Sequence, residues 1–329
     1  MDVKNPNSNR INPFRKFYDS DAFINSPKHK AKNLIFPIMV DIELTNHCNL
    51  NCFFCGQIVM KREKGFMSKD IFTKIIDECK EHNTPIRLIR WGEPFLHKNI
   101  MDYCSYIKKN DLIVHITTNG LLLNESNIQF MVDQEIDSIK FSFQGATKEQ
   151  YQEMRNTNKY DILKKNIHDL VNIRGSNDKP YIHISSTMTN ETNEEIEEFI
   201  DYWKHIVDSV GVGKTNLSLI QINEISSPKI KKTVELLKSK ESVKKEYRPC
   251  GEVYRKLSVD WDGKISCCCS DYDNHLTVGD INESTLKDAW KCDKLKAFRV
   301  ILDHQMHKCL TRCSMCYHEY DHINTIRKN

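Results

Sequence analysis

Hydrophobic and polar positions divide this chain into alternating strand-like and helix-like stretches. Six apolar, β-rich runs are predicted strands, at residues 38–44, 86–91, 112–117, 139–143, 181–187 and 217–222. Between them the apolar period becomes helical: after a possible cap at Ser68, for example, Ile71, Ile75 and Cys79 share one face. Similar patterns span residues 100–107, 124–134, 148–171 and 194–207. Alternation of this kind predicts parallel βαβ units, as an α/β fold in either an open doubly wound sheet or a partial barrel.

The two ends of the chain depart from this alternation. Residues 1–35 are polar and irregular, and we expect an extension that packs on or trails from a first domain of residues 36–228. A lysine-rich stretch, 229–249, is interpreted as a solvated linker helix. Residues 250–329 are predicted to form a second domain, with a hairpin (257–261 and 264–268) and a helix (286–302).

Composition narrows the function classes. The formal net charge of +3 over 329 residues is nearly balanced, and no basic face alternates with aromatic residues, so no nucleic-acid partner is expected. No signal-like segment opens the chain and no run approaches eighteen apolar residues, which predicts a cytoplasmic protein without a membrane partner. In a reducing compartment the thirteen cysteines are expected to serve as thiolates for metal or catalysis.

The first cysteine cluster follows the first predicted strand directly. Cys48, Cys52 and Cys55 form a C-x3-C-x2-C loop, at the strand end where α/β folds build their sites. Three thiolates can hold one four-iron cluster and leave one iron without a protein ligand. That iron could chelate the amino and carboxylate groups of a methionine moiety. The alternative is a zinc site completed by His47 or a distant residue, although zinc sites favour C-x2-C spacing and four protein ligands.

The loop resembles the signature of the radical S-adenosylmethionine (SAM) superfamily, in which an aromatic residue, here Phe54, precedes the third cysteine. The resemblance extends over residues 36 to about 225 and implies a partial (β/α)6 barrel, of the TIM type, whose cluster (4Fe-4S) binds SAM. After the second strand the family carries Gly-Gly-Glu-Pro, whose backbone binds the methionine amino group. This chain has Gly92 and Glu93 in place, but Trp91 replaces the first glycine.

Later strand ends add to the resemblance. Asn119 lies in a Thr-Asn-Gly turn typical of the family, and Ser142 opens a motif in which Gln144 replaces the usual aspartate. The resemblance implies that Ser142 and Arg155 contact the carboxylate or ribose of the cofactor. Each motif is also common as an ordinary turn, cap or surface residue, and their shared order along the chain carries the resemblance.

The C-terminal cysteines resemble those of the SPASM or shorter twitch extension, which holds an auxiliary 4Fe-4S cluster. The resemblance implies four ligands, Cys250, Cys268, Cys313 and Cys316, with Cys267, Cys269 and Cys309 spare. Four thiolates would close the cluster to substrate and leave electron transfer as its task. A four-cysteine zinc ribbon is the alternative. The remaining cysteines, Cys79, Cys104 and Cys292, lie in helical patterns and are expected only to pack or to lie at the surface.

Together these features predict a radical SAM oxidoreductase. It would cleave SAM reductively to a 5'-deoxyadenosyl radical, abstract hydrogen from a small molecule (sugar- or aminocyclitol-like), and pass an electron to the auxiliary cluster. A flavodoxin or ferredoxin would supply the first electron.

Two other functions stay open at this point. The chain could be a maturase that modifies a peptide, although only about 35 residues precede the barrel, too few for a leader-binding domain. It could also be a non-catalytic zinc or iron-sulfur scaffold. The sequence names acid-base candidates in Glu224, Asp271 and His183, but raises none of them above a turn or core residue, so the catalytic base is unknown.

Overall fold

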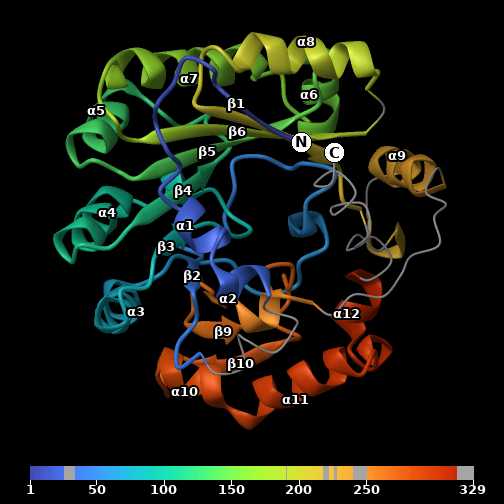
Figure 1. The fold of residues 1–329 in the computed structure, drawn as a ribbon. Helices are drawn as coiled ribbons and strands as arrows, with labels where there is room; N and C mark the ends of the chain where they lie inside the picture. The colour runs from blue at the N-terminus through green and yellow to red at the C-terminus, as the bar shows by residue number, and fades with distance from the viewer. Residues whose placement is uncertain (26–33, 190, 218–221, 226–227, 240–249, 317–329) are drawn as a thin grey trace.

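A computed structural model describes residues 1–25, 34–189, 191–217, 222–225, 228–239 and 250–316. Its centre is a curved sheet of parallel strands that follow one another in chain order from β2 to β7 (Figure 1). A doubly wound sheet would reverse its order at a switch point, and this one does not, so the barrel prediction is confirmed. The parallel strands are β2 (Met39–Ile42), β3 (Ile86–Leu88), β4 (Val114–Thr118), β5 (Ser138–Gln144), β6 (Tyr181–Met188) and β7 (Ser209–Lys214).

The sixth predicted strand is wrong. Residues 217–222 were expected to form it, but the strand is β7, Ser209–Lys214, which pairs in parallel with β6. Gly211 and Gly213 interrupt its β-forming residues, and this weakens the strand pattern in the sequence. Ile222 begins a short 3-10 turn, η5 (Ile222–Glu224), and residues 218–221 lie outside the described part of the chain.

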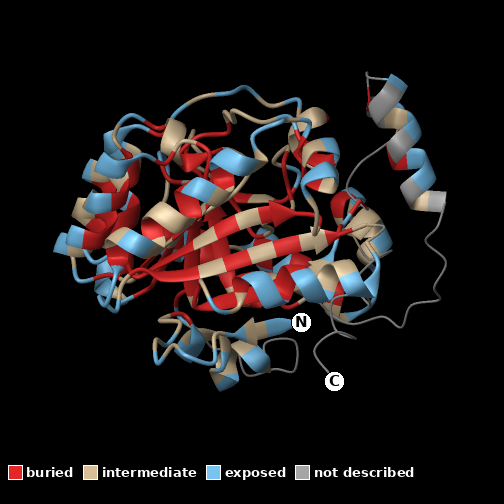
Figure 2. Ribbon diagram, turned by 90° about the horizontal axis from the view of Figure 1, so that it is seen from above, coloured by how far each residue is buried: buried red, intermediate tan, exposed pale blue. Residues whose placement is uncertain are grey.

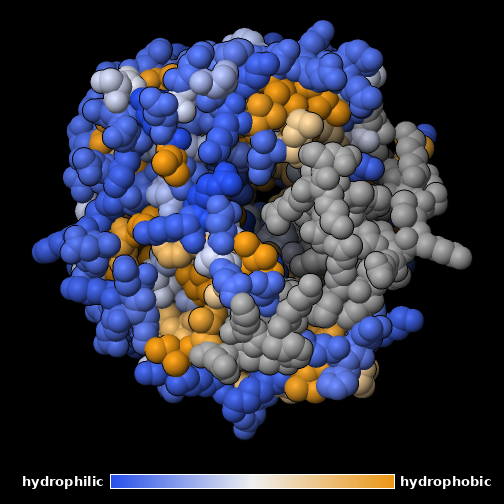
Figure 3. All heavy atoms as spheres, in the orientation of Figure 1, coloured by the Kyte–Doolittle hydropathy of each residue, from blue (hydrophilic) through white to orange (hydrophobic). Residues whose placement is uncertain are grey.

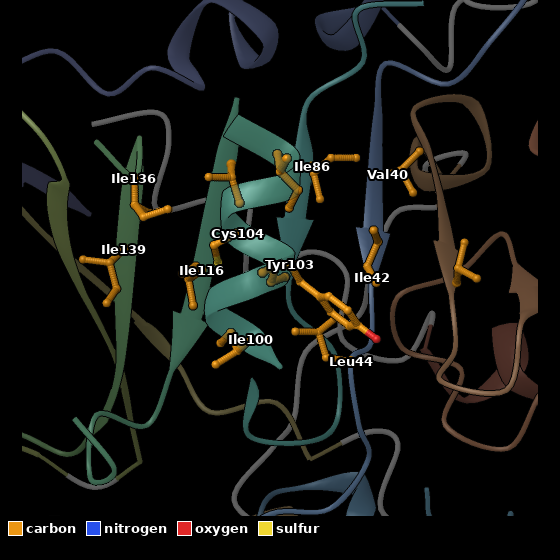
Figure 4. Packing of buried hydrophobic residues seen from close by; sticks show 14 of the residues in the cluster. Val40, Ile42, Leu44, Ile86, Ile100, Tyr103, Cys104, Ile116, Ile136 and Ile139 are labelled. Atoms are coloured by element: carbon orange, nitrogen blue, oxygen red, sulfur yellow. The ribbon is translucent and has the colours of Figure 1, made fainter. Parts of the chain in front are cut away.

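Helices cover the outer face of the barrel, and the apolar core lies between them and the strands (Figures 1 and 2). Figure 4 shows one sector, where α4 packs over β2, β3 and β4. Ser68 accepts a hydrogen bond from the Ile71 amide at the start of α3, as predicted. The predicted helix 148–171 is two helices, because Asn156 takes a left-handed conformation with φ 52°. The helices are α3 (Lys69–Glu81), α4 (Ile100–Lys109), α5 (Glu125–Asp133), α6 (Lys148–Arg155), α7 (Tyr160–Arg174) and α8 (Asn193–Trp203).

The C-terminal residues continue the same sheet. The predicted hairpin is present as β8 (Lys256–Val259) and β9 (Lys264–Ser266), and β8 pairs in parallel with β2. Strand β10 (Thr277–Asp280) completes a ten-stranded sheet. The predicted helix 286–302 is broken at Cys292, which caps the second half. The helices here are α9 (Pro228–Ser239), α10 (Leu286–Lys291), α11 (Asp293–Asp303) and α12 (Thr311–Cys316).

The N-terminal extension closes one end of the barrel. Strand β1 (Asp2–Lys4) pairs antiparallel with β7, and the short helices α1 (Arg15–Tyr18) and α2 (Asp21–Ile24) lie across the opening between the strands (Figure 1). Phe14 is only 1% exposed and meets the ring of His115 edge-on at 5.6 Å. Arg87 donates a hydrogen bond of 3.1 Å to the Tyr18 hydroxyl. These contacts seal the amino-terminal ends of the strands.

The inner face of the barrel is polar. On β5, Ile139, Phe141 and Phe143 belong to the apolar core, while the alternating residues Lys140 and Ser142 are only partly buried. Because strand side chains alternate between the two faces, Lys140 and Ser142 face the lumen. The same alternation on β4 and β6 places these residues on the inner face: His115, Thr117, His183, Ser185 and Thr187.

The surface of the described residues that faces the viewer in Figure 3 is mainly hydrophilic. Within the described ranges, no helix is long and apolar enough to cross a bilayer.

Candidate functional site

The loop after β2 carries the three cysteines of the first cluster at the carboxyl-terminal end of the barrel. Its path is fixed from within: Gln57 donates a hydrogen bond of 2.7 Å to the carbonyl of Asn46, and the Thr45 hydroxyl donates to that of Gly65 at 2.6 Å. Cys52 is buried, Cys48 and Cys55 are half-buried, and none forms a disulfide. The loop therefore presents three free thiols from one rigid turn.

Two side chains that the resemblance singled out point at these thiols. The side-chain nitrogen Nδ2 of Asn119 lies 3.8 Å from the Cys48 sulfur, and a guanidinium nitrogen of Arg155 lies 3.7 Å from the Cys52 sulfur. Donors at these positions stabilise charge on thiolates. The structure thus brings Asn119, directly after β4, and Arg155, at the end of α6, to the cysteine loop.

Arg155 also links the loop to β5. Its guanidinium donates to the carbonyl oxygens of Ser142 and Phe143, and its carbon Cζ lies 5.4 Å from the centre of the Phe54 ring. Arg155 is therefore a buried site residue and not a surface helix residue. Four of the predicted cofactor residues, Phe54, Asn119, Ser142 and Arg155, gather in this way around the loop.

Gly92 and Glu93 lock the second strand end against the same loop. A Cβ atom added to Gly92 would lie 1.9 Å from the carbonyl oxygen of Thr45, so only glycine fits there. The Glu93 amide donates to the carbonyl of His47 at 2.9 Å. The Glu93 carboxylate accepts hydrogen bonds from the backbone N–H of Asn119 and from the hydroxyl of Thr118, both at 2.7 Å. Burial nevertheless raises its pKa to about 7.

The departures from the family pattern have defined partners. Trp91 packs edge-on against Tyr272 at 5.6 Å, so it connects the barrel with the C-terminal unit. Gln144 is buried and forms hydrogen bonds with the hydroxyls of Thr187 and Thr215. An uncharged side chain therefore stands where the family pattern has an aspartate. The imidazole ring of His47 stacks on the ring of Phe66, with 4.8 Å between the ring centres.

The donor set fits an iron-sulfur cluster better than a single ion. Burial raises the pKa of the Cys48 thiol to about 11 and that of Cys55 to about 12, so these two thiolates would persist here only with a bound cation. Among the described residues no three Cys, His, Asp or Glu side chains converge on one point. A four-iron cubane does not need such convergence, because each thiolate binds a separate iron.

The site also has unused donors. The side-chain amide nitrogen of Asn49 and the Nε of Arg155 are buried without a hydrogen-bond partner. Buried polar groups of this kind are costly unless a ligand satisfies them. The residues present therefore suit a cluster with a polar ligand beside it.

A second group of cysteines lies in the C-terminal unit. Burial raises the thiol pKa of Cys267, Cys268 and Cys313, and neighbouring thiols raise it further, Cys250 among them in each case. The amide of Ser270 donates to the Cys268 sulfur at 3.4 Å. These thiols would each be stabilised by a shared metal centre. The structure adds Cys267 to this neighbourhood, and the predicted ligand set stays a prediction.

The other cysteines have different surroundings. Cys269 lies close enough to Cys268 to act on its thiol but turns to the Glu252 carboxylate at 3.5 Å, and Cys309 is exposed. Cys79 and Cys104 are buried in the apolar core, which confirms their predicted packing role. Cys292 accepts the amide of Leu295 as a helix cap.

The acid-base candidates divide in the structure. Asp271 is buried and accepts the amide of Leu276 at 2.7 Å, which identifies it as a turn-forming residue. His183 faces the lumen and hydrogen bonds the Ser209 hydroxyl at 2.8 Å. The side chain of Glu224 lies outside the described residues. No general base is assigned.

The sequence did not reveal one feature of the site, a layer of ionisable side chains across the lumen. Asp41 accepts two hydrogen bonds from Arg87, at 2.6 and 2.8 Å, and pairs with Lys256 at 3.2 Å. Lys256 also pairs with Glu252 at 2.6 Å. Period-two alternation of Asp41 and Arg87 with apolar neighbours was a signal for inward-facing charge, but only the closed sheet brings the charges together.

Comparison with known proteins links both cysteine regions to families. The family model described as "Radical SAM superfamily" matches residues 42–202. A second model, the SPASM "iron-sulfur cluster-binding domain", matches residues 250–317. A Pyrococcus furiosus protein named "Tungsten-containing aldehyde ferredoxin oxidoreductase cofactor-modifying protein" is 24% identical over 308 residues, which cover 83% of this chain and 86% of that protein.

Two solved structures share the fold. Streptococcus suis SuiB bound to the precursor peptide SuiA has a TM-score of 0.64 at 18% identity, covering 87% of this chain and 72% of SuiB. BtrN in complex with AdoMet and 2-DOIA has a TM-score of 0.52 at 17% identity, covering 84% of this chain and 90% of BtrN. At these identities the structures establish shared architecture.

Proposed function

Because this chain belongs to the radical SAM superfamily and carries a C-terminal SPASM domain, it is an iron-sulfur enzyme that uses SAM, and we propose that it oxidises a polar small molecule. When bound, SAM and the clusters would supply the redox chemistry: reductive cleavage of SAM and abstraction of a hydrogen atom from the substrate, which would then release a proton to a base or to water and pass one electron to the auxiliary cluster. A flavodoxin or ferredoxin would supply the initiating electron.

The residues of this chain would hold and orient these groups. Cys48, Cys52 and Cys55 would ligate the first cluster, and Cys250, Cys268, Cys313 and Cys316 the auxiliary one. Arg155 and Asn119 would stabilise the first cluster's thiolates by the contacts described above. Phe14 and the helices α1 and α2 would exclude water from the lumen, which protects reactive intermediates.

The observation that carries the small-molecule proposal is the lumen itself. Its lining between the cysteine loop and the sealed end is hydroxylated and charged, with Thr117, Ser142, Ser185 and Thr187 on adjacent strands. Hydroxyls donate and accept hydrogen bonds, so such a lining suits a substrate with many polar groups. Two similar proteins support this proposal: BtrN was solved in complex with AdoMet and 2-DOIA, and the Pyrococcus protein is named for modifying a cofactor.

A peptide is the second candidate substrate. The support for it is the similarity to SuiB, which was solved with its precursor peptide SuiA bound. A peptide would have to enter from the cysteine side of the barrel, because α1 and α2 lie across the other opening (Figure 1).

The test is anaerobic reconstitution with iron and sulfide, followed by a SAM cleavage assay. We expect 5'-deoxyadenosine from the parent chain and none from Cys48→Ala, Cys52→Ala or Cys55→Ala. The control is Cys309→Ala, an exposed cysteine that should retain cleavage. Turnover that survives loss of a loop cysteine, or zinc in the loop after anaerobic purification, would refute the proposal. No 5'-deoxyadenosine at all would favour a scaffold, and formation only with peptide would favour a maturase.

A further inference from the structure

Among the described residues, Arg87, Lys140 and Lys256 form a cationic layer in the lumen, and two of them have carboxylate partners. Arg87 is held by Asp41 through two hydrogen bonds, and Lys256 pairs with both Asp41 and Glu252. For the third, Lys140, the described part of the chain offers no hydrogen bond or ion pair. In the described structure these three cations share two carboxylates, and Glu252 also pairs with Arg255 at 3.7 Å, so positive charge is in excess and Lys140 is the cation of this layer without an ion pair.

We propose that Lys140 binds an anionic group of the substrate, a carboxylate or a phosphate, inside the barrel. This proposal rests on the proposed function and narrows its substrate class. An ammonium group with three free donors is a general ligand for such anions. A substrate anion would form the ion pair with Lys140 that no described side chain forms.

The position of Lys140 suits an anchor for the far end of a substrate. It lies two residues before Ser142 on β5, and Ser142 contacts Arg155 beside the first cluster. Two residues of a strand span about 7 Å. A small molecule held at Lys140 could therefore extend towards the cysteine loop and present a carbon atom there.

Neighbouring groups do not neutralise this charge. His115 bonds the hydroxyls of Ser138 and Thr117, and burial lowers its pKa well below the usual value. Burial likewise lowers the pKa of His183 to about 4, so both histidines are neutral near pH 7.

Two further groups act on this layer from other elements. The carboxylate of Asp2, on β1, acts on His183, but Asp2 is exposed. The Cys269 thiol faces the layer from the C-terminal unit, beside Glu252. Neither is a hydrogen-bonded partner of Lys140 in the described structure.

The energetics favour a functional explanation over a structural one. Burial lowers the pKa of Lys140 to about 8, with the charge of Arg87 adding to the effect. A cation inside the barrel without an ion-pair partner destabilises the fold, and a methionine of similar length would be tolerated better if packing were the only task. Lys140 therefore carries a charge that is unfavourable for folding, at a position where a bound anion could pair with it.

The experiment measures anion binding by the reconstituted full-length chain, without any turnover. The free energy of unfolding is measured at increasing concentrations of sodium phosphate or sodium acetate. Each series is compared with sodium chloride at equal ionic strength. The stabilisation gives a Kd, because a ligand of the folded state stabilises by RT ln(1 + [L]/Kd). The variants are Lys140→Met, Lys140→Arg and the control Lys165→Met, an exposed lysine on α7 that removes the same charge elsewhere.

We expect Lys140→Met to raise the Kd of the bound anion at least tenfold, which corresponds to about 1.4 kcal/mol. Lys140→Arg and Lys165→Met should bind within a few-fold of the parent chain. Without anion, Lys140→Met should unfold no more easily than the parent chain, which a structural lysine would contradict. Preference for phosphate or for acetate identifies the substrate group.

The proposal is overturned if neither anion stabilises the parent chain beyond chloride, or if Lys140→Met binds as the parent does. If Lys140→Met does not fold, Lys140→Gln takes its place under the same criteria. This outcome is independent of SAM cleavage. A chain that binds the anion through Lys140 but forms no 5'-deoxyadenosine would refute the proposed function and leave the anion site standing.

Discussion

Replacing Arg90 with methionine should separate the C-terminal unit from the barrel. The side chain of Arg90 is 1% exposed, and its guanidinium makes three hydrogen bonds to that unit: 2.6 Å to the Asp260 carboxylate, 2.9 Å to the carbonyl of Cys268 and 3.0 Å to that of Asp271. The Asp260 carboxylate is fully buried. In Arg90→Met its nearest remaining cation would be Arg62, at 3.7 Å and already bonded to a glutamate.

The expected cost follows from leaving that carboxylate unpaired. Removing one partner of a buried ion pair destabilises a protein by about 3–5 kcal/mol. Total unfolding free energies are about 5–15 kcal/mol, so the loss should be a large fraction of the whole. Because Arg90 also holds the backbone at Cys268, a predicted auxiliary ligand, we expect the variant to lose iron from the auxiliary cluster before the first one.

The assay is urea unfolding of the reconstituted chain, with iron counted per chain. The matched control is the double variant Arg90→Met with Asp260→Leu, which removes both charges. It should recover about 2 kcal/mol or more relative to the sum of the single variants. A loss below about 1 kcal/mol in Arg90→Met, or a double variant no better than that sum, would refute the reasoning.

Three further predictions test other parts of the fold. In Gly92→Ala the new Cβ would meet a backbone oxygen at 1.9 Å, so the cysteine loop must shift, and iron at the first cluster and 5'-deoxyadenosine should both fall severely. Burial alone would raise the pKa of Asp41, but Arg87 and Lys256 lower it well below the usual value. The resulting stability is present above about pH 4 and lost as pH falls further, so Asp41→Asn should flatten the acid limb of the unfolding free energy against pH. Phe14→Ala should cost up to about 3–5 kcal/mol and speed amide exchange in β1, and unchanged exchange there would show that the extension does not seal the barrel.

Local patterns were sufficient for most of the barrel. Five of the six predicted strands are present, because apolar β-branched runs buried on one face leave a clear period in the sequence. Strand β7 was missed because two of its six residues are glycines, while residues 217–222 look more strand-like in isolation. The pairing of β8 with β2 joins residues more than 200 positions apart, and no local pattern encodes that contact.

The site divides in the same way. Cysteine spacing predicted the loop, and the resemblance predicted Asn119 and Arg155, both of which the fold brings to sulfur atoms. The lumen charges were not predicted. They come from four different strands and from the 3-10 turn that begins at Glu252, and a side chain that alternates with apolar neighbours could equally face solvent until the sheet closes.

The closure of the barrel explains how so polar an interior is compatible with a stable fold. Barrels of this type normally fill their interior with branched apolar side chains. Here the apolar core lies almost wholly between strands and helices, and the lumen carries paired charges and hydroxyls instead. Such a lumen would fill with bulk water if its end were open, which would weaken each charge pair. Sealing by Phe14 and Tyr18 therefore does more than add contacts: it keeps the lumen at low dielectric, so that one unpaired cation, Lys140, can select among substrates.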